Sequence, residues 1–164
     1  MISNSVFKLS VLALGTVALV ACSNSEKKQI AAESYVDWVD PLIGIGGHGH
    51  VFVGASIPHG MIQLGPNNNK KGWDWCSGYH DSDSTIIGFA HTHLSGTGIA
   101  DLGDILLMPA VSVIDSAGYL SSSAYVSTFL KQEELVTPGF YQVKLHPSGV
   151  NVELTAGERV GKVS

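Results

Sequence analysis

The sequence predicts a mostly β fold, with the strands arranged as an antiparallel β-sandwich. Tyr141, Val143 and Leu145 alternate with polar residues, and residues 152–156 repeat the pattern. This period of two buries one face of a strand and leaves the other in water. Residues 35–164 contain no long segment with the 3.6-residue period of an amphipathic helix, and frequent glycines divide them into short elements.

Length and composition restrict the class of protein. The chain has 164 residues, a formal net charge of −5, 45% hydrophobic residues and 14% charged residues. This length fits one domain with a tail, and the hydrophobic content is too high for a disordered chain. Nine Lys and Arg against 14 Asp and Glu argue against a nucleic-acid partner, because phosphate binding needs a basic surface.

The N-terminal segment has the pattern of a secretory signal. Residues 11–21 form a continuous apolar run that follows Lys8. The run is too short to cross a bilayer as a helix, which takes about 20 apolar residues. Its end, Leu19-Val20-Ala21-Cys22, resembles a bacterial lipobox, in which the cysteine is lipidated and becomes the mature N-terminus. The alternative is an ordinary signal peptide that is cut near the same point.

We therefore divide the chain into a lipoprotein signal peptide over 1–21, a flexible tether over 22–34 and a domain over 35–164. Lipidation of Cys22 would hold the protein on the membrane of a bacterial cell envelope, either in the periplasm or at the outer-membrane surface. The second cysteine, Cys76, then has no partner in the chain and is predicted to be a free thiol.

The domain begins with a glycine-rich stretch and continues with short apolar runs. Six glycines within residues 43–60 exclude a helix there and predict a shaped loop. Residues 61–64 predict a short strand that ends at Gly65-Pro66, and the polar residues 67–71 predict a turn. Residues 84–90 and 104–108 are apolar runs of strand length, the first rich in β-branched side chains and the second ending at a proline.

The clearest strands lie near the C-terminus. The alternating segments 141–145 and 152–156 are separated by Pro147-Ser148-Gly149, whose residue types favour a turn. We therefore predict an antiparallel hairpin over these segments.

Histidines form pairs with the spacing of metal ligands. Six of the seven histidines lie between His48 and His93, and two pairs are spaced i, i+2. Side chains at that spacing point to one side of a strand, so each pair could bind one transition-metal ion or could instead hydrogen-bond neighbouring loops. The pairs are His48 with His50 and His91 with His93, and the candidates for a third ligand are His59, His80, Asp101 and Asp104.

The segment Trp73-Asp74-Trp75 has the chemistry of a sugar-binding surface. Indole rings cover the apolar C–H faces of a sugar, and a carboxylate accepts from its hydroxyl groups. The alternative is that both tryptophans belong to the core. The acid pairs Asp81 with Asp83 and Asp101 with Asp104 could serve a glycosidase or cap loops, and their spacing does not decide between the two.

Taken together, these motifs resemble glycoside hydrolase family 92, the calcium-dependent exo-acting α-mannosidases. The resemblance covers nearly the whole predicted domain in order. It is carried by Val39-Asp-Pro-Leu-Ile-Gly-Ile-Gly-Gly-His-Gly-His50, Gly54-Ala-Ser-Ile-Pro-His-Gly-Met-Ile-Gln-Leu-Gly-Pro66, Gly72-Trp-Asp-Trp-Cys-Ser-Gly-Tyr-His80, Ile87-Gly-Phe-Ala-His-Thr-His-Leu-Ser-Gly-Thr-Gly98, Asp101-Leu-Gly-Asp-Ile-Leu-Leu-Met-Pro109, Pro138-Gly-Phe-Tyr141 and Val152-Glu-Leu-Thr155.

The resemblance implies a two-domain glycosidase in which an N-terminal β-sandwich meets a larger (α/α)₆ barrel at the active site. It places the catalytic acid and base and the calcium ligands on the barrel. We therefore expect no catalytic residue and no metal ligand in this chain, an incomplete sandwich, and no activity from the chain alone. In the full enzyme the reaction would be inverting hydrolysis of a terminal α-mannosyl bond.

The resemblance also implies that the sandwich supplies one wall of a pocket for mannose-containing glycans. By position, the residues of that wall are Gly47, His48, Trp73, Asp74, Trp75, Cys76, His80 and His93. Two alternatives stay open, a surface glycan-binding lipoprotein without catalysis and a histidine-based metal-binding envelope protein.

Overall fold

A computed structural model describes residues 34–111 and 125–164, and residues 35–164 form one compact unit. The predicted signal peptide, the lipidation site Cys22 and all but the last residue of the tether lie outside the described residues. Within the described ranges, no helix has the length and apolar character that crossing a membrane requires.

Short strands and single turns of 3₁₀ helix make up the unit, which confirms the mostly β class. In chain order the elements are η1 (Tyr35–Trp38), β1 (Ala55–Ser56), β2 (Gln63–Asn67), η2 (Trp73–Trp75), β3 (Thr85–Ile86), β4 (Gly88–Ala90), β5 (Ser127–Thr128), η5 (Lys131–Glu133), β6 (Leu135–Thr137), β7 (Phe140–Lys144), β8 (Asn151–Ala156) and β9 (Gly161–Val163).

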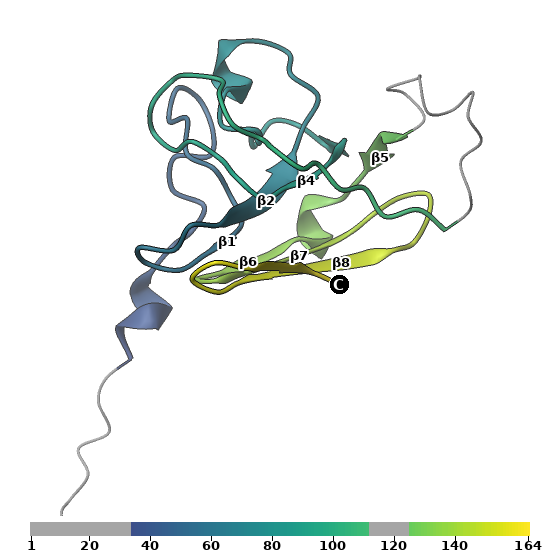
Figure 1. Cartoon of the computed structure of the whole chain (residues 1–164). Coiled ribbons are helices and arrows are strands. Elements are labelled where there is room, and N and C mark those ends of the chain that lie inside the picture. The colour runs from purple at the N-terminus through teal and green to yellow at the C-terminus, as the bar shows by residue number, and fades with distance from the viewer. Residues whose placement is uncertain (1–33, 112–124) are drawn as a thin grey trace, which may run out of the picture. The chain divides into compact units, whose positions relative to one another are not determined.

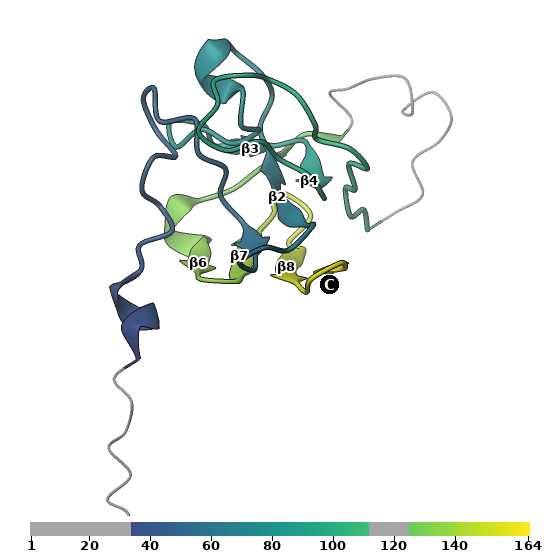
Figure 2. The ribbon, with the colours of Figure 1, turned by 60° about the vertical axis from the view of Figure 1, so that its left-hand side comes forward.

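Two antiparallel sheets enclose the core. One has the strand order β1-β2-β4 and the other the order β6-β7-β8-β9, while β3 and β5 form a separate pair. Strand β1 packs against β7 and β8, and β2 packs against β8. Figures 1 and 2 show β2 and β4 on the opposite side of the core from β7 and β8. Buried side chains from both sheets fill the space between them: Ala55, Leu64, Phe89, Tyr141, Val143, Val152 and Leu154.

The predicted C-terminal hairpin is confirmed. Tyr141 lies opposite Leu154 and Val143 opposite Val152 in the β7–β8 ladder, and all four side chains are buried. Because directly opposite residues share a face of the sheet, the two alternating patterns combine into one apolar surface. Each of these burials stabilises the fold by about 1.5–3 kcal/mol relative to an exposed side chain.

The second strand is longer than predicted. It does not end at Gly65-Pro66 but continues to Asn67, with Pro66 opposite Phe89 of β4. Asn68, which was expected in a solvated turn, is buried and bridges two segments through its amide group. Its nitrogen donates to the carbonyl of Thr85 at 2.6 Å, and its oxygen accepts from the backbone nitrogen of His80 at 2.6 Å.

The apolar runs 84–90 and 104–108 differ from the prediction. The first run is divided before Gly88, whose φ of +155° takes the chain from β3, which pairs with β5, into β4, which pairs with β2. The second run is not a strand and contributes a single bridge, between Leu107 and Phe89. Its backbone cannot stay extended, because Ile105 has a φ of +55°.

Candidate functional site

The 3₁₀ turn η2 sends its side chains to two different places. Cys76 N donates to the carbonyl of Trp73 at 3.0 Å, which closes a turn of three residues. Because a 3₁₀ helix has three residues per turn, consecutive side chains diverge by about 120°. Trp73 and Asp74 therefore lie in a cluster with two histidines, whereas Trp75 and Cys76 line a neighbouring pocket.

In the cluster, one carboxylate oxygen lies between two imidazoles. Oδ1 of Asp74 is 2.7 Å from Nδ1 of His48 and 3.0 Å from Nε2 of His50. The bond from His48, followed by that from His50, holds the pKa of Asp74 below its ordinary value, so the carboxylate is ionised at neutral pH. His48 is 79% exposed at its side chain and His50 only 6% exposed, so the cluster opens to solvent on the His48 side.

His50 is held in place by the loop that follows β4. Its backbone has a φ of +54°, and its carbonyl accepts from the nitrogen of Gly96 at 2.6 Å and from the hydroxyl of Ser77. The indole of Trp73 meets the His50 ring edge-on, with ring centroids 4.2 Å apart. The indole nitrogen of Trp73 donates to the carbonyl of Gly98 at 2.7 Å. These contacts pre-position a buried imidazole beside Asp74.

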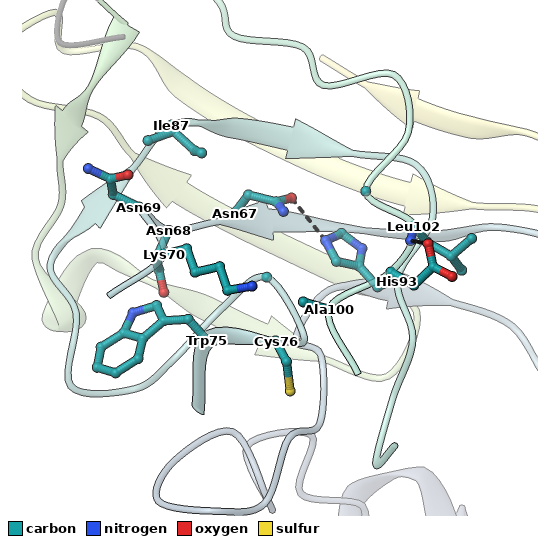
Figure 3. Close-up of a pocket in the computed structure, with 13 residues that line it drawn as sticks. Asn67, Asn68, Asn69, Lys70, Trp75, Cys76, Ile87, His93, Ala100 and Leu102 are labelled. Carbon is teal, nitrogen blue, oxygen red and sulfur yellow. Dashed lines mark hydrogen bonds between the residues drawn. The ribbon is translucent and has the colours of Figure 1, made fainter. Parts of the chain in front are cut away.

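The pocket on the other side of η2 has a volume of about 330 Å³ and is shown in Figure 3. Its polar lining includes Asn67, Asn68, Asn69 and Lys70, for which the sequence predicts no site. The run of asparagines and lysines over 67–71 predicts a polar turn, and the structure instead places its first part in the pocket wall. The lining residues are Asn67, Asn68, Asn69, Lys70, Trp75, Cys76, Gly78, Ile87, His93, Ala100, Asp101, Leu102 and Gly103.

His93 is a buried part of the pocket wall. Its Nδ1 donates to the carbonyl of Gln63 at 2.7 Å, and its Nε2 lies 2.9 Å from Oδ1 of Asn67 (Figure 3). Burial lowers the pKa of His93 more than the Gln63 bond raises it, so the ring is neutral at neutral pH. A neutral ring leaves Nε2 as an acceptor. A half-turn of the Asn67 amide would present its nitrogen to the ring and its oxygen to the pocket.

His80 connects the pocket wall to the glycine-rich loop at Gly47. The His80 ring stacks on Trp75 with centroids 4.4 Å apart, and its Nε2 lies 3.2 Å from the carbonyl of Gly47. Neither residue lines the pocket, and the His80 ring links the aromatic wall to the exposed Gly47 of the glycine-rich loop.

Asp83 is the buried anchor of this aromatic wall. Its carboxylate accepts from the indole of Trp75 at 3.0 Å and from the hydroxyl of Thr85 at 2.8 Å, and it pairs with Lys71 at 2.9 Å. Burial alone would raise the pKa of Asp83, but bonds from Lys71, Thr85, Trp75 and Ser84 together lower it to about 2. All of these partners are groups of the domain itself, so we assign to this carboxylate a role in stabilising the fold and not in binding a ligand.

The other acids proposed as glycosidase pairs contact a lysine, a backbone nitrogen or a threonine hydroxyl. Asp81 binds Nζ of Lys131 at 3.1 Å, and Asp101 accepts from the backbone nitrogen of Leu102 at 2.9 Å. Asp104 lies at hydrogen-bond distance from the hydroxyl of Thr92. Bonds from backbone nitrogens support loop capping for Asp83 and Asp101, whereas Asp81 lies in an ion pair and Asp104 contacts a threonine hydroxyl.

The two histidine pairs behave differently. Nδ1 of His91 lies 3.3 Å from the carbonyl oxygen of Ile105. The ring of His93 hydrogen-bonds to Gln63 and Asn67, so both side chains of this pair bond to neighbouring segments. His48 and His50 instead converge, and with Asp74 they form the one group of three potential metal ligands in the described part of the chain. The third member is thus not among the residues expected from the sequence, His59, His80, Asp101 and Asp104.

Comparisons with known proteins agree on one family. The family model described as the glycosyl hydrolase family 92 N-terminal domain matches residues 38–163. The family GH92 α-mannosidase BT3965 from Bacteroides thetaiotaomicron, solved in complex with mannoimidazole, is 38% identical with a TM-score of 0.72, and the match covers 80% of this chain and 18% of that one.

Two further relatives extend the comparison. The family GH92 inverting mannosidase BT2199 from B. thetaiotaomicron VPI-5482 is 28% identical with a TM-score of 0.59, over 79% of this chain and 18% of that one. An uncharacterized secreted glycosidase from Arthroderma benhamiae is 30% identical over 124 residues, which is 74% of this chain and 16% of that protein. The chain therefore spans less than a fifth of the length of these relatives.

Proposed function

Because the chain belongs to glycoside hydrolase family 92 and matches its N-terminal domain, we propose that residues 35–164 form one wall of the mannose pocket of an exo-acting α-mannosidase. The observation that carries the proposal is the position of Trp73 beside Asp74. The indole is 61% exposed, and its neighbour is an ionised carboxylate that is partly open to solvent.

This pair offers both halves of a sugar-binding contact. The indole face covers the C–H groups of a pyranose ring, and an ionised carboxylate accepts from two hydroxyl groups at once. Because the bonds from His48 and His50 keep Asp74 ionised, it is an acceptor at every pH near neutrality. His48, which is exposed beside it, adds a further polar group at the same face.

The neighbouring pocket supports the same proposal. Its volume of about 330 Å³ lies at the lower end of the range for small-molecule sites, which suits a single sugar ring. Asn67, Asn69, Lys70 and Asp101 offer donors and acceptors to hydroxyl groups, and Trp75 supplies an apolar face. We assign Trp75, Cys76 and His93 to this part of the wall, and we assign to His80 and Gly47 the role of holding it in place.

The reaction of the whole enzyme would be inverting hydrolysis of a terminal α-mannosyl bond in a glycan or glycoprotein. Such a reaction needs a general acid and a general base on opposite sides of the anomeric carbon. The acids Asp81, Asp83, Asp101 and Asp104 bond to lysine, hydroxyl or backbone groups of this domain, which supports placing both catalytic groups in the family's barrel domain.

Calcium, the metal that the family resemblance implies, does not fit the donor group found here. Calcium takes six to eight oxygen ligands, whereas the group of His48, His50 and Asp74 offers two imidazole nitrogens and one carboxylate. The calcium ligands are therefore assigned outside this chain. We also propose that Cys22 anchors the protein to a bacterial envelope, because an apolar run of eleven residues ends directly before it and a polar tether follows.

The experiment is ligand-observed saturation-transfer NMR of the purified chain with methyl α-mannoside. Trp73→Ala and Asp74→Asn should each remove most of the transfer, whereas Trp38→Ala, which changes a similarly exposed indole on η1, should leave it intact. Saturation transfer to the mannoside that persists in both Trp73→Ala and Asp74→Asn would contradict the proposal, as would a lack of transfer from the unmodified chain. Binding that proves equally strong for a glucoside would favour a general glycan-binding surface over a mannose wall.

A further inference from the structure

We infer that His48, His50 and Asp74 form a binding site for a zinc-like divalent transition-metal ion. This site goes beyond the sugar-binding function proposed above, and it departs from the expectation that the chain holds no metal ligand. Three potential ligand atoms point toward one another. They are Nδ1 of His48, Nε2 of His50 and a carboxylate oxygen of Asp74, and all lie within 4.8 Å of one another.

The spacing of these atoms is close to that of a metal site. With zinc–ligand bonds of about 2.0–2.2 Å and tetrahedral angles, neighbouring ligand atoms are separated by about 3.4 Å. Oδ1 of Asp74 is already 2.7 Å from the His48 nitrogen and 3.0 Å from the His50 nitrogen. An ion therefore needs the Asp74 oxygen to move away from each nitrogen by less than about 1 Å. The two nitrogens, which lie within 4.8 Å of each other, need to approach by at most about 1.4 Å, and the ion takes the place of the protons that now link the three groups.

The identity of the ligands selects the ion. Two imidazole nitrogens with one carboxylate suit zinc, copper or nickel, whereas calcium and magnesium prefer oxygen ligands alone. Three protein ligands leave one coordination position open, as in zinc sites that keep an exchangeable water. As a carboxylate, the Asp74 ligand also supplies a negative charge that partly neutralises a divalent ion.

The surrounding structure holds two of the ligands before any ion arrives. His50 is buried, with its carbonyl bound to Gly96 N and its ring packed against Trp73. Asp74 is fixed on η2 by the turn that Cys76 N closes at the carbonyl of Trp73. His48 is exposed and free to adjust its ring, so the last ligand can complete the geometry without disturbing the core. This combination of two placed ligands and one adjustable ligand lowers the cost of binding.

The test is isothermal titration calorimetry of the full chain, purified without a histidine tag and stripped with a chelator, against zinc chloride. One ion should bind per chain, and calcium chloride should give no heat at this site. His48→Ala and Asp74→Asn should each weaken binding by more than the roughly 10–100-fold that changes around a metal ligand produce. Because His48 is exposed and Asn has the shape of Asp, neither change should prevent folding, which near-ultraviolet circular dichroism checks.

A matched control uses the other close imidazole–carboxylate pair, His146 with Glu133 at 2.6 Å. His146→Ala should bind zinc as the unmodified chain does. Cobalt should give the visible absorption bands of a four-coordinate site, and these should disappear in Asp74→Asn. No zinc binding, or binding that both His48→Ala and Asp74→Asn leave unchanged, would overturn the inference. Since no sugar is present, the result is separate from the outcome of the mannoside experiment.

Discussion

The carboxylate of Asp83 accepts a hydrogen bond of 3.0 Å from the indole nitrogen of Trp75, and it does so with a side chain that has no exposure to solvent. The same carboxylate takes bonds from the backbone nitrogens of Ser84 and Thr85. It therefore joins the start of β3 to the aromatic wall of the pocket. The position of the wall depends on a residue that no ligand would touch.

Asp83→Ala should lower the free energy of unfolding by about 3 kcal/mol, because several buried donors lose their acceptor together. Urea denaturation followed by circular dichroism measures this change. Asp81→Ala is the control, since that carboxylate is exposed and pairs with Lys131 at the surface, where such pairs contribute about 0–1 kcal/mol. Equal losses in the two variants would show that Asp83 does not anchor the wall.

Lowering the pH should remove the contribution of the Asp83 carboxylate to the free energy of unfolding. The pKa of Asp83 is about 2 in the folded protein and near 3.8 when unfolded, so the unfolded chain binds the proton more readily in this range. Stability from this group is therefore complete above about pH 5 and is lost as the pH falls through 2, with a total of about 2 kcal/mol. Urea denaturation between pH 6 and pH 2 should show a smaller fall for Asp83→Asn than for the unmodified chain. If the free energy of unfolding fell equally with pH in both proteins, Asp83 would not be the group whose protonation destabilises the fold.

Gly65 lies where β2 passes closest to Val53, and a Cβ at this position would collide with the carbonyl oxygen of Val53. Gly65→Ala should therefore destabilise the domain by about 1–3 kcal/mol, because backbone must move to admit one methyl group. A Cβ at Gly72 would meet open space, and the φ of Gly72 is extended, so Gly72→Ala should change stability by less than about 0.5 kcal/mol. Thermal unfolding of the two variants compares them directly, and similar melting temperatures would refute the close approach.

Lipidation should depend on Cys22. We expect labelled palmitate to enter the unmodified protein in a bacterial host and not to enter Cys22→Ala, which should leave the membrane fraction. Cys76→Ala serves as the control, because Cys76 is buried in the domain and should not affect labelling. Labelling that persists in Cys22→Ala would exclude the lipobox interpretation.

The chain alone should not hydrolyse an activated aryl α-mannoside, even with calcium. Asp81 and Asp101 bond to Lys131 and to a backbone nitrogen. A sugar held on one wall alone leaves the reacting bond in water, where charges stabilise a transition state least. Release of the aryl alcohol, followed by absorbance, should stay at the level of buffer. Turnover that disappears in Asp74→Asn or Asp104→Asn would place catalysis in this domain.

The alternation and turn residues of a short stretch of sequence were sufficient to predict elements whose partners are close in the sequence. The β7–β8 hairpin followed from alternation around a short turn, because the two strands bury the same face against one core. The glycine-rich loop predicted over 43–60 was right as far as Gly54, since backbone freedom there is a property of the residues themselves. Its last part was wrong, because Ala55–Ser56 form strand β1 by pairing with β2. The motifs also indicated the family, which the match to residues 38–163 confirms.

Contacts between distant segments were decided by the tertiary structure. Asp74 lies between His48 and His50, from which it is separated by 26 and 24 residues, and no spacing in the chain indicates that pairing. The same holds for Asn68, whose polarity suggested a solvated turn but whose amide bridges Thr85 and His80 inside the protein. The sequence by itself determined which residue types were present and which local conformations they allow. Only packing of the whole chain determined which polar groups meet, because a buried donor or acceptor takes whatever partner the fold brings within reach.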